Sequence, residues 1–169
     1  PCVLIWSLGN EAGFGYAYQN AGRWTKEYDP TRLTHYESST WDHSNRFDKS
    51  MLDLYSRMYA TTEEVDSYFA EEGPKKPFIQ CEFVHAMGNG PGDIEDYLEV
   101  ILPEKRIIGA FVWEWCDHAT YEGKTPDGKD KYFYGGDYGE FPHDGNFCMD
   151  GLVYSDRRPH TGLHEWKNA

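Results

Sequence analysis

The segment Val3–Glu11, VLIWSLGNE, decides the fold of this chain. Its first residues form a short apolar run rich in β-branched and aromatic side chains, which is typical of a parallel strand buried on both faces. Gly9 ends the run, and Asn10 and Glu11 follow at the carboxyl end of the predicted strand. In barrels of alternating strands and helices the loops after the strands carry the chemistry, so we expect catalytic side chains here. The alternative is that Asn10 and Glu11 only cap the next helix.

A second segment repeats this design. Residues 78–81 form a short apolar run, Glu82 ends it, and a loop containing Gly88 follows. If both were ordinary surface glutamates among many, their position at the end of two apolar strands would have no explanation. The repeated pattern therefore favours a pair of catalytic carboxylates, Glu11 and Glu82, over a capping role.

The rest of the chain predicts alternating strands and helices. Thr61 and Glu64 form a capping box, so a helix should run from Thr61 to about Glu72. Further helices are expected over residues 16–28, 93–102 and from 163 onward. Further strands are expected over residues 34–37, 54–59, 78–81, 107–113 and 152–154.

Residues 117–151 are rich in Gly, Asp, Tyr and Phe and show no helical period. We interpret them as hairpins and loops over the mouth of a barrel. Loops of this length are usually functional or disordered, and the aromatic content favours function. Roughly five parallel strands with helices between them indicate an α/β chain. A complete (β/α)₈ barrel needs about 250 residues, so residues 1–169 are expected to be a fragment of one catalytic domain with a partial barrel.

Composition excludes several classes of protein. With 39% apolar and 17% aromatic residues the chain is not disordered, and the surplus of aromatic rings suits either sugar stacking or large core fillers. A formal net charge of -13 argues against a nucleic-acid partner. The sequence contains no run of eighteen apolar residues, so no membrane span is predicted. The four cysteines lack metal-binding spacing, so no zinc site or disulfide framework is expected.

A series of motifs occurs in one order along almost the whole chain: WSLGNE at 6–11, CEFVHAMGN at 81–89, GAFVWEWCD at 109–117, YGGDYG at 134–139 and FCMDGLV at 147–153. Asp156-Arg157 and Pro159-His160 follow them. The set resembles the β-galactosidases of glycoside hydrolase family 2. The resemblance implies strands four to eight of the catalytic barrel. It also implies hydrolysis of terminal non-reducing β-D-galactosides such as lactose, with retention of configuration.

The resemblance implies a role for several of these residues. Glu11 would be the general acid/base and Glu82 the nucleophile, about 5 to 5.5 Å apart as in retaining enzymes. Asn10 would bond the sugar 2-hydroxyl, and Tyr59 would donate a hydrogen bond to the nucleophile. The plainer interpretations are a turn-forming asparagine and a core tyrosine.

Two more residues would bind the sugar ring by the same resemblance. His85 would contact the galactosyl hydroxyls near C6, and Trp113 would stack under the galactose. A structural histidine and a packed tryptophan are the alternatives. His35 and Glu37 also end a predicted strand at the mouth, and the resemblance assigns no role to either.

Two metal sites are implied by the resemblance. Glu11 would also ligate Mg²⁺, but the matching Glu and His lie upstream of Pro1, so this site is incomplete here. The main-chain carbonyl of Phe147 and a side-chain oxygen of Asp150 would bind Na⁺. Relatives carry Asn where this chain has Asp150, and the carboxylate adds charge while keeping an oxygen ligand.

Two functional hypotheses remain open beside that of a β-galactosidase. Another family 2 glycosidase, such as a β-glucuronidase or β-mannosidase, would share Asn10-Glu11, although residues 147–152 argue against it. A non-catalytic carbohydrate-binding or assembly module would keep the aromatic residues, although both glutamates argue against decay.

Part of a barrel has open strand edges and an exposed apolar inner face, here Val3, Ile5, Ile79 and Phe111. We therefore expect a homo-oligomer, and an isolated chain without activity. We also expect a cytoplasmic location, with a periplasmic one left open, and no membrane or nucleic-acid partner.

Overall fold

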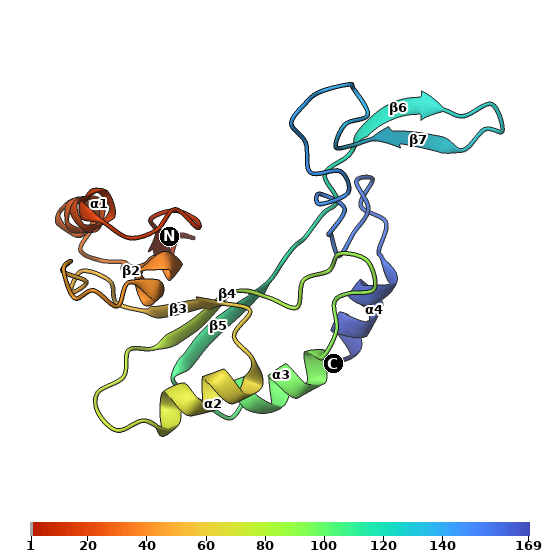
Figure 1. Cartoon of the computed structure of the whole chain (residues 1–169). Helices are drawn as coiled ribbons and strands as arrows, with labels where there is room; N and C mark the ends of the chain where they lie inside the picture. Colours follow the sequence, from red (N-terminus) through yellow and green to blue (C-terminus); the bar gives the residue numbers. More distant parts are fainter. Residues whose placement is uncertain (1) are drawn as a thin grey trace. The chain divides into compact units, whose positions relative to one another are not determined.

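The computed structural model describes residues 2–169 as two compact units. Unit 1 comprises residues 2–82 and Glu99–Ala110, and unit 2 comprises Phe83–Leu98 and Phe111–Ala169. The strands are β1 (Ile5–Ser7), β2 (Leu33–His35), β3 (Tyr55–Met58), β4 (Phe78–Phe83), β5 (Ile107–Val112), β6 (Thr120–Lys124) and β7 (Asp130–Phe133) (Figure 1). The helices are α1 (Tyr16–Tyr28), α2 (Thr62–Ala70), α3 (Ile94–Ile101), α4 (Thr161–Asn168) and the 3₁₀ helix η1 (Glu37–Trp41). No helix within residues 2–169 is long and apolar enough to cross a membrane.

The predicted α/β class with parallel strands is confirmed. β1 pairs with β2 in parallel, and β3 pairs with β4 in parallel. The strand order is β1-β2 in one sheet and β3-β4-β5 in another. β4 extends through Glu82 to Phe83, so Glu82 lies within the strand and not after it as predicted.

The predicted strand over residues 34–37 is wrong at its end. β2 stops at His35, and Glu37 begins η1. Ser39 donates to the carbonyl of Tyr36 from both its amide and its hydroxyl, at 3.2 and 2.7 Å. Local bonds of this kind give the backbone an alternative to the sheet, and they turn the chain at the carboxyl end of β2.

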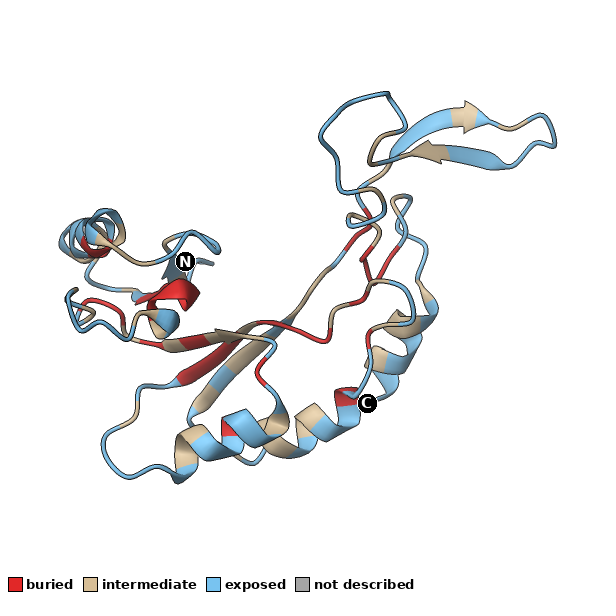
Figure 2. Cartoon of the chain, in the orientation of Figure 1, coloured by how far each residue is buried: buried red, intermediate tan, exposed pale blue. Residues whose placement is uncertain are grey.

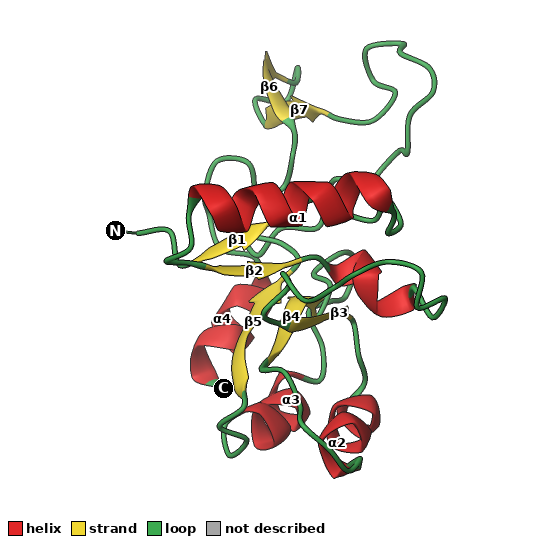
Figure 3. Cartoon of the chain, turned by 90° about the vertical axis from the view of Figure 1, so that its left-hand side faces the viewer, coloured by secondary structure: helices red, strands yellow, loops and turns green. Residues whose placement is uncertain are grey.

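The first core of unit 1 lies under α1. Tyr36, Met51 and Leu52 are buried there, and Tyr18 of α1 stacks on Tyr36 with ring centroids 4.0 Å apart. A Cβ at Gly22 would meet the Cγ of Met51 at 2.5 Å, so any larger residue would require the side chain of Met51 to shift. Figure 3 shows α1 running along the β1–β2 pair.

The second core of unit 1 lies between α2 and the start of β4. Val65 and Phe78 are buried with Ala60, and Tyr55, Tyr68 and Phe69 pack against them. The predicted capping box is confirmed, because Thr61 and Glu64 bond each other's backbone amides. α2 ends at Ala70, two residues before the predicted end.

The expected exposed inner face is only partly present. Val3 and Phe111 are 38% and 56% exposed, but Ile79 is buried because it lies in β4, the middle strand of its sheet (Figure 2). The predicted burial of β1 on both faces is wrong, since Trp6 is 38% exposed. β1 pairs only with β2 within the described residues, which leaves its other edge open.

Unit 2 contains the predicted excursion, and a hairpin is confirmed there. β6 and β7 pair antiparallel. The predicted strand at 152–154 is wrong, because Val153 makes single bridges to Cys116 and to Pro159 and no longer ladder. Proline lacks an N–H, so a ladder cannot continue through Pro159.

Candidate active site

Tyr59 and Glu82 are joined through both backbone and side chain. The amide of Tyr59 donates to the carbonyl of Glu82 at 2.9 Å, and its hydroxyl donates to Glu82 Oε2, also at 2.9 Å. Tyr59 has a φ of 51°, a conformation that non-glycine residues adopt infrequently and that clusters at functional sites. The predicted contact is thus present, while the catalytic roles of both residues stay predictions.

A buried glutamine fixes the turn that carries Tyr59. Gln80 of β4 is fully buried, and its amide donates to the carbonyl of Ala60 at 2.7 Å while accepting from the Ala60 amide at 3.3 Å. Both polar groups of this buried amide are therefore satisfied by one backbone residue. The turn after β3 is thereby tied to β4 two residues before Glu82.

The charges of two other carboxylates in unit 1 act on Glu82. Burial raises the pKa of Glu82, and the negative charges of Glu11 and Glu37 raise it further, whereas the hydrogen bond from Tyr59 lowers it. Glu82 is only 8% exposed. A strand end with a buried carboxylate next to two like charges is an arrangement that tunes acid and base strength.

Glu11 lies at the tip of the loop after β1, as the sequence predicts. It is exposed with a φ of 47°, and Asn10 beside it is exposed too. The next amide, that of Ala12, donates to the hydroxyl of Tyr36 at 3.1 Å and anchors the loop to the first core. Glu11 lines a pocket of about 390 Å³ with residues from η1 and β3.

Glu37 is a site residue whose role the sequence does not reveal. It is 5% exposed at the start of η1, and it accepts hydrogen bonds from the indole Nε1 of Trp41 and, at 3.2 Å, from Ser38 Oγ. The sequence signal was its position at the end of the predicted strand. Its burial and its partners depend on the 3₁₀ turn, which the pattern did not predict.

Cys81 precedes Glu82 and is chemically shielded. Its thiol donates to the carbonyl of Arg57 at 3.3 Å, and burial raises its pKa to about 11. A thiol with such a pKa stays protonated at neutral pH, so it does not act as a nucleophile.

Unit 2 brings together the other predicted residues around Asp150. Trp113 Nε1 donates to Asp150 Oδ2 at 3.1 Å, and His85 Nε2 lies 3.8 Å from the same oxygen. The amide of Ala86 donates to the carbonyl of Trp113 at 2.7 Å. The rings of His85 and Phe147 lie 5.7 Å apart between centroids. A histidine, two aromatic rings and a carboxylate thus form one group.

Asp150 also has the features of a cation ligand. Its Oδ1 is buried without a hydrogen-bond partner, and the side chain is almost fully buried. An unpaired buried carboxylate oxygen is costly unless a cation or a donor compensates it. Within residues 2–169, no group of three or more His, Cys, Asp or Glu side chains is arranged to hold a metal ion.

Glu114 is a second residue that sequence reasoning missed. Burial raises its pKa to about 7, and Asp150 raises it by a hydrogen bond and by its charge, while His118, 3.3 Å away, lowers it. The relation depends on Asp150, which is 36 residues away in the sequence, so no local pattern could predict it. The Trp113–Glu114 peptide bond is cis.

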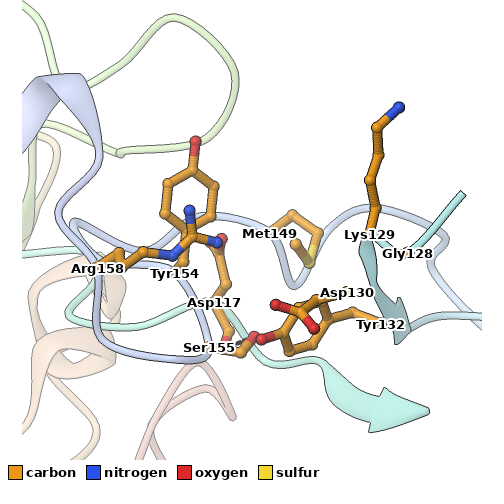
Figure 4. A pocket seen from close by; sticks show the side chains of 9 residues that line it. All are labelled: Asp117, Gly128, Lys129, Asp130, Tyr132, Met149, Tyr154, Ser155 and Arg158. Carbon is orange, nitrogen blue, oxygen red and sulfur yellow. Dashed lines mark hydrogen bonds between the residues drawn. The ribbon is translucent and has the colours of Figure 1, made fainter. Parts of the chain in front are cut away.

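A pocket of about 510 Å³ lies between the β6–β7 hairpin and the loop around Tyr154 (Figure 4). Its charged side chains already have partners. Asp130 accepts from Lys124 at 2.7 Å, and Arg158 donates to Asp156 at 2.6 Å. Asp117 is held by His160 Nε2 at 2.7 Å. Because the charged residues that line this pocket are already paired with one another or with neighbours, they do not indicate which ligand it would bind.

The model of the TIM barrel domain of glycosyl hydrolases family 2 matches residues 1–169. The chain therefore belongs to glycosyl hydrolases family 2. It is 53% identical over 168 residues to a beta-galactosidase of Actinobacillus pleuropneumoniae, covering 99% of this chain and 16% of the relative. It is 42% identical over 178 residues to a beta-galactosidase of Kluyveromyces lactis, covering 100% of this chain and 17% of the relative. The chain spans about a sixth of the length of these curated relatives.

Solved structures support the fold. A beta-glucuronidase of Ruminococcus gnavus matches with a TM-score of 0.61 at 20% identity, covering 99% of this chain and 31% of that protein. A beta-glucuronidase of Faecalibacterium prausnitzii matches with a TM-score of 0.59 at 22% identity over the same share of each. At this identity the similarity concerns the fold alone.

Proposed function

We propose that the chain is part of a β-galactosidase that hydrolyses terminal non-reducing β-D-galactosides. The observation that carries the proposal is the buried Glu82, held by Tyr59 and influenced by the charges of Glu11 and Glu37. The identity of 41–53% with several beta-galactosidases supports the choice of substrate. The chain would supply about strands four to eight of the barrel, with the β6–β7 hairpin as an excursion over its mouth.

The proposed reaction is a double displacement with retention. Glu11 protonates the glycosidic oxygen while the Glu82 carboxylate attacks the anomeric carbon, so the leaving alcohol departs and a galactosyl ester forms. Glu11, now ionised, takes a proton from water, whose oxygen attacks the same carbon and releases Glu82. Tyr59 keeps Glu82 ionised and fixed in position. Asn10 bonds the 2-hydroxyl during both steps.

The group around Asp150 would bind the galactosyl ring. Trp113 supplies an aromatic face, oriented by its hydrogen bond to Asp150, and His85 supplies a donor or acceptor for hydroxyls near C6. A galactoside is neutral at C6, whereas a glucuronide carries a carboxylate there. The acidic Asp150, 3.8 Å from His85, favours the neutral sugar, because a uronate would be repelled.

Cations enter this proposal through two residues. The unpaired Oδ1 of Asp150 and the carbonyl of Phe147 would hold Na⁺, which supplies a positive charge to a sugar hydroxyl. Glu11 would be one ligand of Mg²⁺. That ion would need further ligands from outside this chain, given that residues 2–169 contain no group of three metal-binding side chains.

The experiment uses the whole enzyme that contains this chain. Glu82→Gln should abolish turnover of a galactoside, because an amide cannot form the ester, and Glu27→Gln on the exposed side of α1 is the matched control. Proton NMR of the first product should show the β-anomer. Turnover by Glu82→Gln within tenfold of wild type, or an α-anomer as first product, would refute the mechanism. Sugar binding without hydrolysis by wild type would instead support a binding module.

A further inference from the structure

We propose that the buried hydroxyl of Tyr36 positions Glu11 for proton transfer to and from the substrate, with Tyr18 holding the ring of Tyr36 in place. The inference rests on the proposed function, in which Glu11 is the general acid/base. It adds two positioning residues, neither of which would touch the sugar.

Glu11 lies in a strained part of the loop after β1, and this loop is held from the carboxyl end of β2. The φ of Glu11 is 47°, and non-glycine residues keep such a conformation only where the surroundings hold it. The amide of Leu8 donates to the carbonyl of His35 at 3.1 Å. The amide of Ala12 donates to the hydroxyl of Tyr36, also at 3.1 Å. The backbone is therefore anchored on either side of Glu11.

Tyr36 is itself fixed at both its backbone and its ring. It is 1% exposed, and its carbonyl accepts from the amide and the hydroxyl of Ser39. Its ring stacks on that of Tyr18 with an angle of 14° between the planes, and the ring of Phe14 lies 6.2 Å away between centroids. Water does not replace a hydroxyl that is buried to this extent, so the hydroxyl of Tyr36 determines where the Ala12 amide lies.

Tyr18 connects Tyr36 to the loop. A hydrogen bond to the hydroxyl of Tyr36 raises the pKa of Tyr18, because Tyr18 is the donor. A Cβ at Gly9 would meet the ring and the hydroxyl of Tyr18 at 3.0 Å, so this tyrosine packs directly against the backbone two residues before Glu11. Tyr18 thus contacts both Tyr36 and the loop that Tyr36 anchors.

The proposed nucleophile is held by other contacts. Tyr59 bonds Glu82, and Gln80 fixes the turn that carries Tyr59. Loss of the Tyr36 hydroxyl should therefore displace Glu11 and leave Glu82 in place. A general acid contributes about 10²- to 10⁴-fold, and only within hydrogen-bond reach of the atom that it protonates. Hydrolysis should consequently slow for leaving groups that need a proton and not for those that depart as stable anions.

The test compares Tyr36→Phe with wild type in the whole enzyme, using galactosides whose leaving groups range from dinitrophenol to phenol. The value of kcat/KM reports the steps up to the departure of the leaving group. For the dinitrophenyl galactoside it should stay within about threefold of wild type, and for the phenyl galactoside it should fall about tenfold or more. Tyr68→Phe is the matched control, because it removes a hydroxyl that donates to the carbonyl of Lys76 at 2.9 Å in the second core. It should keep the wild-type dependence on the leaving group.

The second half of the reaction gives an independent measurement. There Glu11 takes a proton from water, whereas azide is already an anion and needs no base. A nitrogen of azide attacks the anomeric carbon and releases the carboxylate of Glu82, which gives galactosyl azide. Azide should therefore raise kcat of Tyr36→Phe for the dinitrophenyl galactoside about threefold or more, with galactosyl azide as product. It should have no such effect on Tyr68→Phe.

A double variant shows whether Tyr36 acts through Glu11. In Glu11→Ala the general acid is absent, so adding Tyr36→Phe should leave the dependence on the leaving group unchanged within about twofold. A merely structural Tyr36 would lower kcat/KM by the same factor for every galactoside in both backgrounds. Should Tyr36→Phe fail to fold, Tyr18→Phe removes the neighbouring hydroxyl and keeps the stacked ring. The phenyl galactoside should then lose about threefold relative to the dinitrophenyl galactoside.

Equal losses for the two galactosides in Tyr36→Phe, or in Tyr18→Phe if only that variant folds, would overturn the inference. A further change of the leaving-group dependence in the Glu11→Ala background would overturn it too. Failure of the proposed function looks different, because wild type would then hydrolyse no galactoside, or Glu11→Ala would keep the wild-type dependence on the leaving group.

Discussion

Replacing Tyr59 by phenylalanine tests the electrostatics of the site, because it removes one oxygen and keeps the ring. The hydroxyl of Tyr59 donates to Glu82 Oε2 at 2.9 Å, and this bond lowers the pKa of Glu82 against burial and two like charges. Without it the pKa of Glu82 rises. Since Glu82 must be ionised to act as the proposed nucleophile, the acid limb of the pH profile of kcat/KM should move to higher pH.

The magnitude follows from the kind of bond that is lost. A hydrogen bond to a charged group contributes about 1.5–3 kcal/mol, and each 1.4 kcal/mol is tenfold in rate. Glu82 is 8% exposed, so water replaces the missing donor poorly. On the plateau of the profile, kcat/KM should therefore fall about 10- to 150-fold.

The assay is the pH dependence of kcat/KM for a galactoside in the whole enzyme, measured for wild type and Tyr59→Phe. Tyr28→Phe is the matched control, since Tyr28 is 76% exposed on α1 and its ring can still stack on Trp24. An acid limb that stays in place or moves to lower pH in Tyr59→Phe would refute the reasoning, whatever the loss of rate.

Three further predictions concern unit 1. Glu37→Gln removes a charge that raises the pKa of Glu82, so the acid limb should move to lower pH, opposite to Tyr59→Phe, in the same assay. Phe78→Ala empties a fully buried position among aromatic rings, and denaturant unfolding should show a loss of about 3–5 kcal/mol; a loss below about 1 kcal/mol would contradict the packing. Thr61→Ala removes the hydroxyl that accepts a hydrogen bond from the Glu64 amide, and it should lower the free energy of unfolding by about 1 kcal/mol. Thr61→Ser should stay near wild type in the same unfolding measurement.

The sequence predicted those parts of the fold that depend on local patterns. A proline-free segment that stops at Asp29-Pro30 located α1, the capping box located α2 to within two residues, and apolar runs located the parallel strands. The contact between Tyr59 and Glu82 was implied by the family resemblance and not by a local pattern. The structure explains the contact, because Tyr59 follows β3 and Glu82 lies in the adjacent parallel strand β4.

The parts that were missed depend on contacts between distant or competing groups. Glu37 was assigned to a strand, but side-chain bonds of Ser39 and Trp41 turn the backbone into η1. Burial raises the pKa of Glu114, and Asp150, far along the chain, raises it further. The strand expected around Val153 is reduced to single bridges by the turn and by Pro159 that follow it.

The raised pKa of the Cys81 thiol has a consequence for the reactivity of this part of the chain. With a pKa of about 11, roughly one thiol in ten thousand is ionised at pH 7, and peroxides and alkylating agents react with the ionised form. The sulfur atom directly adjacent in sequence to Glu82, the proposed nucleophile, should therefore react slowly with oxidants. Electrophilic sugar analogues that bind in the site should covalently label the carboxylate of Glu82 and leave the neighbouring sulfur unmodified.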